Sequence, residues 1–458
     1  MPERLVVIGG DAAGMSAASQ ARKRRGRDRL EIVAFERGHH TSYSACGIPY
    51  LVGGVVEEVD ALIVRKPEVF REKQQIDVRM RHEVTAIDLD AREVRARDLE
   101  NERDVVEGFD QLLIATGAKP LRPPIEGSDA TGIFGVQVLD DGLAIEQFLE
   151  TQKPKKAVIV GGGYIGLEMA EALVNRGLEV TLVERDEQPM STLDPDMGKY
   201  VTEALEGLDI TVRTGEEVTR FEAENGFVSA VRTEAGRIEA EVVVLGLGAR
   251  PNTELAESAG VPLGTSGGIK VDRRMQTEVD GVWAAGDCAE KFHLILRKGV
   301  AIALGTHANK EGRVAGINLS GGYETFPGVV GTAVTKVCGI EIARTGLTEA
   351  EAAESGFEFV TATVDSTTRA GYFPGTMKIK TKMVVERVSG RLLGAQILGQ
   401  EGAAKRIDVL ATALWNRMTV DDMLNMDLGY APPFAPVWDP VLIAARKAWA
   451  RVEETIET

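Results

Sequence analysis

The chain has 458 residues, of which 44% are apolar and 27% charged, an ordinary composition for a globular protein. At roughly 150 residues per domain, this length predicts about three domains. The 53 basic and 70 acidic residues give a net charge of −17, which argues against a nucleic-acid partner, and no apolar run approaches the ~18 residues that span a bilayer, which excludes an integral membrane protein.

The first elements predict a dinucleotide-binding unit. Residues 4–8 are a β-branched run that predicts a strand, so we expect no signal or transit peptide before the fold. The turn Gly9-Gly10-Asp11-Ala12-Ala13-Gly14 follows, and a helical pattern then runs from Met15 to about Arg25. A second predicted strand, 30–35, ends at Glu36, close to the ~20 residues expected between the turn and an acid that binds ribose. Asp11 replaces the middle Gly of the usual pattern, so a nucleotide-free turn is the alternative.

The end of the first predicted helix carries a dense basic segment. Residues 22–29 hold six Arg or Lys side chains. Ser16, Gln20 and Lys23 fall at i, i+4 and i+7, which predicts one polar stripe on this helix, and Arg22 adjoins it. The alternative for this segment is a set of cations that stabilise a helix C-terminus.

Cys46 is the strongest candidate for a reactive group. It precedes Gly-Ile-Pro, and Pro49 suits the first turn of a helix. A sulfur at a helix N-terminus faces free N–H groups, so we expect a depressed pKa and a reactive thiolate. The alternative is a small buried hydrophobe, which we accept for Cys288 and Cys338. Three distant Cys residues with no CxxC or zinc spacing predict no disulfide framework, no metal site and a reducing cytoplasm.

A second and cleaner dinucleotide unit follows. Residues 156–160 predict a strand that leads into Gly161-Gly162-Gly163-Tyr164-Ile165-Gly166, then a helix to Asn175. The next strand, 179–183, ends at Glu184, whose carboxylate would accept the ribose hydroxyls of NAD; Arg185 beside it leaves NADP open. Two complete units suggest one resident and one visiting cofactor. A duplicated nucleotide-binding protein without redox chemistry is the alternative.

Three further segments fit a flavin. Residues 110–118 and 242–252 each predict a buried strand that ends in a small-residue turn. Residues 282–287 predict a strand that ends in a Gly-Asp step, where Asp287 can accept a ribityl hydroxyl. The alternative for each segment alone is an ordinary strand-to-loop junction without a ligand. The order of the three segments along the chain favours a flavin-binding site.

With these motifs in this order, the chain resembles the FAD-dependent pyridine-nucleotide disulfide oxidoreductases over essentially its whole length. The segment Ser-Tyr-Ser-Ala-Cys-Gly-Ile-Pro-Tyr at 42–50 holds one Cys, and no His follows His307. This pattern resembles the single-cysteine branch, which contains coenzyme A-disulfide reductases, NADH-dependent persulfide reductases and NADH oxidases. Ala12 stands where peroxidase and many oxidase members carry a His, which lowers the peroxide and oxygen alternatives.

The resemblance implies an α/β fold with two Rossmann-like dinucleotide-binding domains and a C-terminal α+β dimerisation domain. Residues 1–118 and 247–323 would bind FAD, 119–246 would bind NADH or NADPH, and 324–458 would form the interface of a homodimer. It implies FAD contacts at Gly9, Ala12, Ala13, Gly14, Glu36, Ser44, Val84, Thr116, Gly117 and Asp287. It implies NAD contacts at Gly161, Gly163, Tyr164, Ile165, Gly166, Glu184 and Gly248.

The resemblance also implies the chemistry. Tyr372 and Tyr430 lie in Gly/Pro-rich loops and would reach Cys46 of the other subunit, so that the active site is shared. Coenzyme A, held in part as a mixed disulfide on Cys46, would contact Ser16, Gln20, Arg22, Lys23, Ser42, Asn309 and Trp438. The expected activity is NAD(P)H-dependent reduction of coenzyme A disulfide or a related small disulfide or persulfide. The alternatives are an oxygen-reducing NADH oxidase with a Cys sulfenate, and a flavoprotein redox sensor without turnover.

Overall fold

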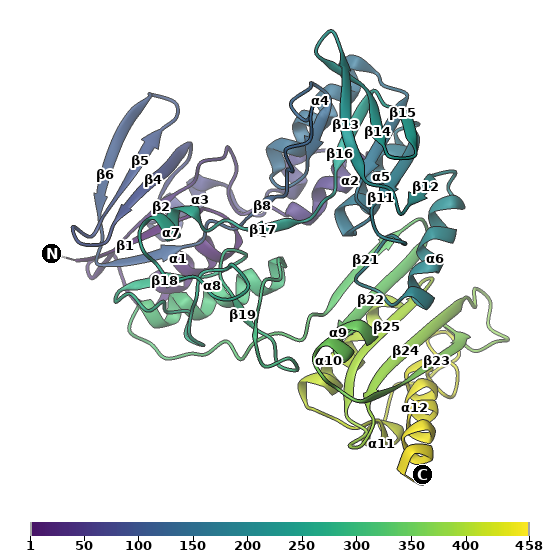
Figure 1. The fold of residues 1–458 in the computed structure, drawn as a ribbon. Coiled ribbons are helices and arrows are strands. Elements are labelled where there is room, and N and C mark those ends of the chain that lie inside the picture. Colours follow the sequence, from purple (N-terminus) through teal and green to yellow (C-terminus); the bar gives the residue numbers. More distant parts are fainter. Residues whose placement is uncertain (1, 457–458) are drawn as a thin grey trace.

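The computed structural model describes residues 2–456, which divide into three parts, each built on its own five-stranded sheet (Figure 1). Two sheets are parallel and carry helices, and the third is antiparallel. This architecture confirms the predicted α/β fold with two dinucleotide-binding units and a C-terminal α+β unit.

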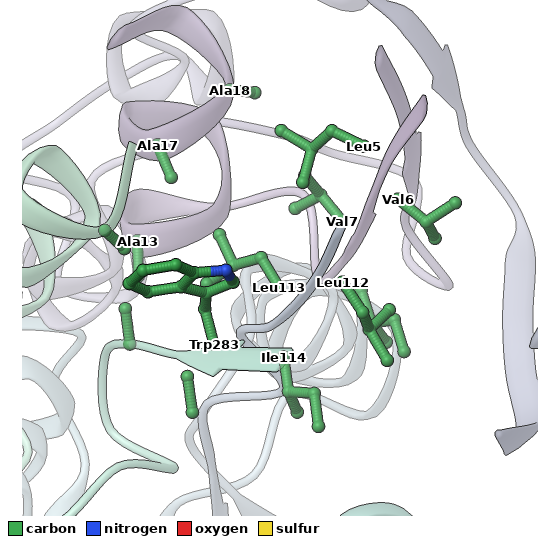
Figure 2. Packing of buried hydrophobic residues seen from close by; sticks show 14 of the residues in the cluster. Leu5, Val6, Val7, Ala13, Ala17, Ala18, Leu112, Leu113, Ile114 and Trp283 are labelled. Carbon is green, nitrogen blue, oxygen red and sulfur yellow. The ribbon is translucent and has the colours of Figure 1, made fainter. Parts of the chain in front are cut away.

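The first parallel sheet has the order β18-β7-β1-β2-β3, and its strands are Val282–Ala284, Gln111–Ile114, Glu3–Ile8, Leu30–Phe35 and Asp77–Arg79. Helix α1 (Ala12–Arg24) connects β1 to β2, and α8 (Gly305–Leu319) packs on α1. A Cβ at Gly312 would lie 2.2 Å from the carbonyl oxygen of Ala13, so the glycine permits this close approach. Figure 2 shows the indole of Trp283 beside Ala13 and Ala17 of α1.

The second parallel sheet has the order β12-β11-β10-β16-β9, and its strands are Thr211–Thr214, Glu179–Glu184, Lys156–Val160, Val242–Leu245 and Ile133–Gly135. Its main helices are α4 (Leu139–Gln152), α5 (Tyr164–Asn175) and α6 (Pro195–Glu206). The two connections to the first part, β8 (Ala118–Pro120) and β17 (Ala249–Pro251), pair antiparallel. The domain boundaries expected at 118/119 and 246/247 lie at this ribbon and remain predictions.

The C-terminal sheet is antiparallel with the order β21-β22-β25-β24-β23, and its strands are Ala333–Val337, Ile340–Gly346, Leu392–Gly399, Lys378–Glu386 and Phe359–Thr367. Its helices are α9 (Glu349–Glu354), α10 (Ile407–Trp415), α11 (Val420–Leu424) and α12 (Pro440–Ile456). Helix α12 packs on β23 and β24, at the yellow end of the chain in Figure 1.

Shorter elements complete the fold. Two small antiparallel sheets consist of β4 to β6 (His82–Asp88, Glu93–Asp98, Arg103–Gly108) and β13 to β15 (Val218–Glu224, Phe227–Thr233, Gly236–Glu239). The remaining helices and strands are η1 (Ala45–Gly47), α2 (Ile48–Val52), η2 (Val59–Leu62), α3 (Pro67–Gln74), α7 (Glu254–Ser258), β19 (Lys291–Phe292), β20 (Gly299–Val300) and η3 (Ala404–Arg406). Across residues 2–456, we find no helix with the length and apolar character needed to cross a membrane.

The strands predicted at 4–8, 30–35, 156–160 and 179–183 agree with the structure to within one residue, but two local features differ from the prediction. Helix α1 begins at Ala12 rather than Met15, because the helix starts directly after the Gly-rich turn. Cys338, expected to be a small buried side chain, is half-buried, because it lies in the tight turn before β22 with a left-handed φ of 52°. Cys288, in contrast, is fully buried, as expected.

Candidate active site

The first Gly-rich turn is shaped to bring backbone close to a phosphate. A Cβ at Gly9 would lie 2.1 Å from the carbonyl oxygen of Ala115, and one at Gly14 would lie 1.9 Å from that of Gly9. Gly9 also has a φ of +108°, so neither position accepts a side chain. The N-cap residue Asp11 makes no side-chain capping bond, and the first turn of α1 holds no acid. The N-terminal N–H groups of α1 therefore remain available to an anion.

The second Gly-rich turn repeats this design at the start of α5. A Cβ at Gly161 would lie 2.6 Å from the carbonyl oxygen of Gly246, and one at Gly166 would lie 1.9 Å from that of Gly161. The N-cap residue Gly163 makes no side-chain capping bond, and Tyr164 and Ile165 begin the helix. The expected NAD contact Gly248 has a φ of +85° and open space around its Cα.

The two acidic residues predicted to bind ribose make matching contacts in the two halves. Glu36 accepts the N–H of Gly10 at 2.7 Å, and Glu184 accepts the N–H of Gly162 at 2.6 Å. Each carboxylate also accepts a second N–H two residues further along its own loop. Each acid is thus held at the end of its strand and beside its own Gly-rich turn.

The Gly286-Asp287 step places an unpartnered acceptor near the first turn. The Oδ1 atom of Asp287 is buried and has no hydrogen-bond partner among the described residues. Burial raises the pKa of this carboxyl, and Lys291 opposes the shift. A buried acceptor without a partner is costly, so a ligand hydroxyl is a natural complement for it. Together with the cradle formed by Gly9 and Gly14, this atom fits a flavin dinucleotide.

The other residues expected to contact FAD lie around the same end of the sheet. Thr116 donates its hydroxyl to the carbonyl of Asn252 at 2.6 Å, and Gly117 has a left-handed φ of +71°. Ser44 donates its N–H to the carbonyl of Leu62 and caps the turn that holds Cys46. Val84 lies in β4, beside the core of the first part.

Cys46 lies in the short helical turn η1, which leads into α2, and its side chain is exposed. Pro49 occupies the first turn of α2, as expected. The expected depression of the Cys46 pKa is wrong for this chain: partial desolvation raises the pKa of the thiol, and the Glu168 and Asp287 carboxylates raise it further. The physical reason is that α2 has only five residues, and acidic groups face the sulfur from other elements.

Asp11 is a further acidic group in the first turn. Its carboxylate accepts the N–H of Tyr43 at 3.3 Å. Burial raises its pKa to about 6, and the Glu36 and Asp287 carboxylates contribute to the increase. Three carboxylates therefore converge around the first Gly-rich turn, and one of them titrates near neutral pH.

Among the residues of α1 and α8 expected to contact coenzyme A, one pair forms a direct contact and Arg22 binds the backbone instead. Ser16 of α1 donates its hydroxyl to the side-chain oxygen of Asn309 in α8 at 2.8 Å, so the structure brings these two together. Gln20 and Lys23 lie further along α1. The guanidinium group of Arg22, however, donates to the backbone carbonyls of Arg25, Leu30 and Gln75. Arg22 thus binds carbonyls at and beyond the end of α1, which agrees with the alternative of cations at a helix C-terminus.

The C-terminal candidates lie on the surface of the single chain. Tyr372 and Tyr430 are 77% and 50% exposed, and Trp438 is half-exposed with the Arg446 guanidinium over its ring at 5.3 Å. Ser42, near Cys46, has a left-handed φ of 50° and accepts the N–H of Val64 through its carbonyl. No contact within the described chain joins either tyrosine to Cys46.

Sequence analysis missed three charged residues near the site. Glu168 of α5 is largely buried, and it is the main charge that raises the pKa of Cys46. Lys291 and Glu311 form a buried ion pair beneath the Gly286-Asp287 step. The local sequence carried no signal for these two, because Lys291 follows Glu290 and Glu311 follows Lys310 in ordinary charged segments. No group of three His, Cys, Asp or Glu side chains within residues 2–456 is arranged to hold a metal ion.

Comparisons with known proteins agree with two dinucleotide-binding units followed by a C-terminal unit. Residues 3–312 match the family model for pyridine nucleotide-disulphide oxidoreductases, and residues 332–440 match the model for their dimerisation domain. The chain is 42% identical to the NAD(P)H coenzyme A polysulfide/persulfide reductase of Pyrococcus horikoshii, covering 97% of this chain and 98% of that protein. It is 31% identical to the coenzyme A disulfide reductase of Staphylococcus haemolyticus, covering 97% and 99%.

A solved structure shows the same arrangement. The NAD-dependent persulfide reductase from A. fulgidus superposes with a TM-score of 0.95 at 39% identity, covering 99% of this chain and 84% of that one.

Proposed function

This chain belongs to the pyridine nucleotide-disulphide oxidoreductase family, and we propose that it reduces coenzyme A disulfide, or a coenzyme A persulfide or polysulfide, with electrons from NAD(P)H. Family membership implies FAD, NAD(P)H and a homodimer built on the C-terminal part. The observation that carries the proposal is Cys46, an exposed thiol in a chain whose other two cysteines are buried or half-buried. We also propose a cytoplasmic location, because the three cysteines are free thiols and the cytoplasm is a reducing compartment.

In this proposal, the first Gly-rich turn binds FAD and the second binds NAD(P)H. Gly9, Gly14 and Glu36 would hold the nucleotide part of FAD, and Asp287 would accept one of its hydroxyls through the unpartnered Oδ1. When bound, FAD supplies the two-electron relay between a nicotinamide and a sulfur. The turn at 161–166, with Glu184, would hold NAD(P)H.

Cys46 performs the sulfur chemistry in this proposal. Its thiolate attacks one sulfur of the substrate disulfide, so that a bond forms between Cys46 and one half while the other half leaves as a thiolate. With a persulfide, the leaving group is hydrosulfide. Two electrons from NAD(P)H then cleave the mixed disulfide and return Cys46 to its thiolate. Burial and the Glu168 carboxylate raise the pKa of Cys46, which disfavours its thiolate in the single chain.

The substrate and partner residues remain part of the proposal. Ser16 and Asn309, joined by their hydrogen bond, would contact coenzyme A with Gln20, Lys23, Ser42 and Trp438. Tyr430 and Tyr372, both exposed in the single chain, would reach Cys46 across the dimer and stabilise the leaving thiolate.

The test is the Cys46→Ser variant of the full-length protein, compared with Cys338→Ser as a matched control. We expect Cys46→Ser to keep its flavin and to lose reduction of coenzyme A disulfide and persulfide, and the wild type to show a coenzyme A adduct on Cys46 by mass spectrometry. Undiminished turnover by Cys46→Ser would reject the proposal. Oxygen uptake without thiol substrate, at a rate equal to disulfide reduction, would favour an NADH oxidase. Flavin bleaching by NADH in a single turnover only would favour a redox sensor.

A further inference from the structure

A buried ion pair lies directly beneath the Gly286-Asp287 step, and the proposed reaction makes no use of it. The side chains of Lys291 and Glu311 are both 0% exposed, with Nζ and Oε2 3.5 Å apart. Lys291 comes from β19 and Glu311 from α8, so the pair joins the loop after β18 to the helix that packs on α1. A buried pair of this kind is often no more stable than an apolar pair of the same volume, so stability alone does not explain it.

The two charges hold one residue from both sides. Glu311 accepts the N–H of Gly286 at 2.8 Å, and Lys291 donates to the carbonyl of Gly286 at 2.9 Å. Lys291 donates also to the carbonyl of Ala289, at 3.1 Å. Gly286 has a φ of +85°, and a Cβ there would lie 2.8 Å from the Cβ of Ala13. The pair therefore fixes Gly286 against the first turn of α1.

This arrangement sets the position of the next residue, Asp287. It follows Gly286 directly, so the orientation of the Gly286 peptide groups sets where the Asp287 side chain begins. Its Oδ1 atom is buried and lacks a partner, and the Oε1 atom of Glu311 is in the same condition. A buried acceptor held at a defined place without a protein partner suits the hydroxyl of a ligand.

We propose that Lys291 and Glu311 are positioning residues for FAD, which they serve by holding the Gly286 peptide so that Asp287 presents Oδ1 to a flavin hydroxyl. This inference rests on the proposed function, because it needs FAD at the first Gly-rich turn. It assigns the pair to cofactor affinity rather than to the reaction at Cys46.

The test measures the dissociation constant of FAD from the apoprotein by quenching of flavin fluorescence, together with the melting temperature of the same apoprotein. The main variant is Lys291→Met/Glu311→Met, which removes both contacts to Gly286 and both members of the ion pair. We expect FAD binding to weaken by about tenfold or more, equivalent to the loss of one good interaction, while the melting temperature changes little. Glu311→Gln, which keeps an acceptor for the Gly286 N–H, should weaken FAD binding less.

A matched control separates affinity from general stability. Lys382 is a buried lysine in the C-terminal sheet with its own carboxylate partners. We expect Lys382→Met to lower the melting temperature and to leave the FAD dissociation constant unchanged. If the double variant does not fold, Lys291→Met/Glu311→Gln decides the question, because it lacks the Lys291 contact to the Gly286 carbonyl and a wild-type FAD affinity in it would contradict the inference.

A double-mutant cycle with Asp287→Ala tests whether the pair acts through Asp287. In that background we expect Lys291→Met/Glu311→Met to weaken FAD binding no further. Fully additive losses would overturn the inference, and so would an unchanged affinity in the double variant. A wild-type protein that binds no FAD would instead reject the proposed function, so the two failures can be told apart.

Discussion

Thr335 of β21 donates its hydroxyl to Oε1 of Glu168 in α5 at 2.6 Å. This bond ties the helix after the second Gly-rich turn to the C-terminal sheet, and the neighbouring bond from the Cys338 N–H to Glu171 strengthens the same contact. Burial raises the pKa of Glu168, while Thr335 lowers it, and its carboxylate in turn raises the pKa of Cys46. One side chain thus links the nucleotide part, the C-terminal part and the reactive sulfur.

Glu168→Gln should lower the pKa of Cys46. The amide keeps an acceptor for Thr335 but removes the negative charge that disfavours the thiolate, so the pKa of Cys46 should decrease. The measurement is the pH dependence of Cys46 alkylation by iodoacetamide between pH 6 and 10, followed peptide by peptide with mass spectrometry.

The matched control is Glu171→Gln, one turn further along α5, whose carboxylate accepts the Cys338 N–H and does not act on Cys46. Its alkylation midpoint should equal that of the wild type. An unchanged midpoint in Glu168→Gln, or an equal shift in both variants, would contradict the assignment.

Local patterns predicted the two nucleotide turns, because a strand, a spaced set of glycines, a helix and a terminal acid are all read within about 40 residues. Local patterns did not predict the direction of the Cys46 pKa shift. The flanking residues suggested a helix N-terminus, whereas the Glu168 and Asp287 carboxylates that raise this pKa belong to elements distant in the sequence. Local patterns missed the Lys291–Glu311 pair for the same reason: only the fold places the loop after β18 on α8. Arg22 was expected to contact coenzyme A, and that contact stays a prediction; its hydrogen bonds to backbone carbonyls cannot be seen from sequence.

FAD affinity should depend on pH through Asp11. Burial raises the pKa of this carboxyl to about 6, with contributions from Glu36 and Asp287, and the Tyr43 and Ala12 N–H groups lower it. The FAD phosphates would add negative charge and raise it further, so binding takes up a proton and FAD binds more tightly on the acid side. We expect affinity to increase by about tenfold as pH falls from 8 to 5, the equivalent of one pKa unit of coupling.

The measurement for Asp11 is FAD titration of the apoprotein at several pH values, with Asp11→Asn as the comparison. The amide cannot titrate, so this variant should bind FAD with an affinity that varies much less over the same range. An equally steep pH dependence in wild type and variant would assign the effect to another group.

Glu184 should favour NADH over NADPH. Its carboxylate is held by the N–H groups of Gly162 and Asp186 at 2.6 and 2.9 Å, so it stays at the end of β11 where a 2′-phosphate would meet it. Glu184→Gln removes the charge and keeps one acceptor oxygen, so it can serve only one of these two N–H groups as the carboxylate does. We expect the ratio of kcat/KM for NADPH to that for NADH to increase about tenfold, the effect of ~1.4 kcal/mol. The exposed neighbour Glu187 provides the control, and an equal change in Glu187→Gln would indicate a general field effect instead.

Lys382 should stabilise the contact between the second nucleotide part and the C-terminal sheet. It is buried in β24, and its Nζ lies 3.1 Å from Asp194, 2.5 Å from Asp196 and 2.6 Å from Glu349. Asp194 is itself buried and exchanges two hydrogen bonds with Gln396. Lys382→Met leaves three carboxylates without their cation, so we expect a loss of about 3–5 kcal/mol in the free energy of unfolding.

The pH dependence of that loss follows from the Lys382 pKa. Burial lowers the pKa of Lys382, but the hydrogen bonds that it donates to the Asp196 and Glu349 carboxylates outweigh this effect, and the net shift is upward from 10.5. A lysine whose folded pKa is raised contributes its full stability below the unfolded value and loses it as pH rises through the folded value. The difference between wild type and Lys382→Met in urea unfolding should therefore hold from pH 7 to 9 and shrink only above about pH 10. The control is Lys378→Met, because Lys378 is exposed in the same strand, and we expect it to change the free energy of unfolding by less than about 0.5 kcal/mol. An equal loss in both variants would show that β24 tolerates no methionine and that the charges are not the cause.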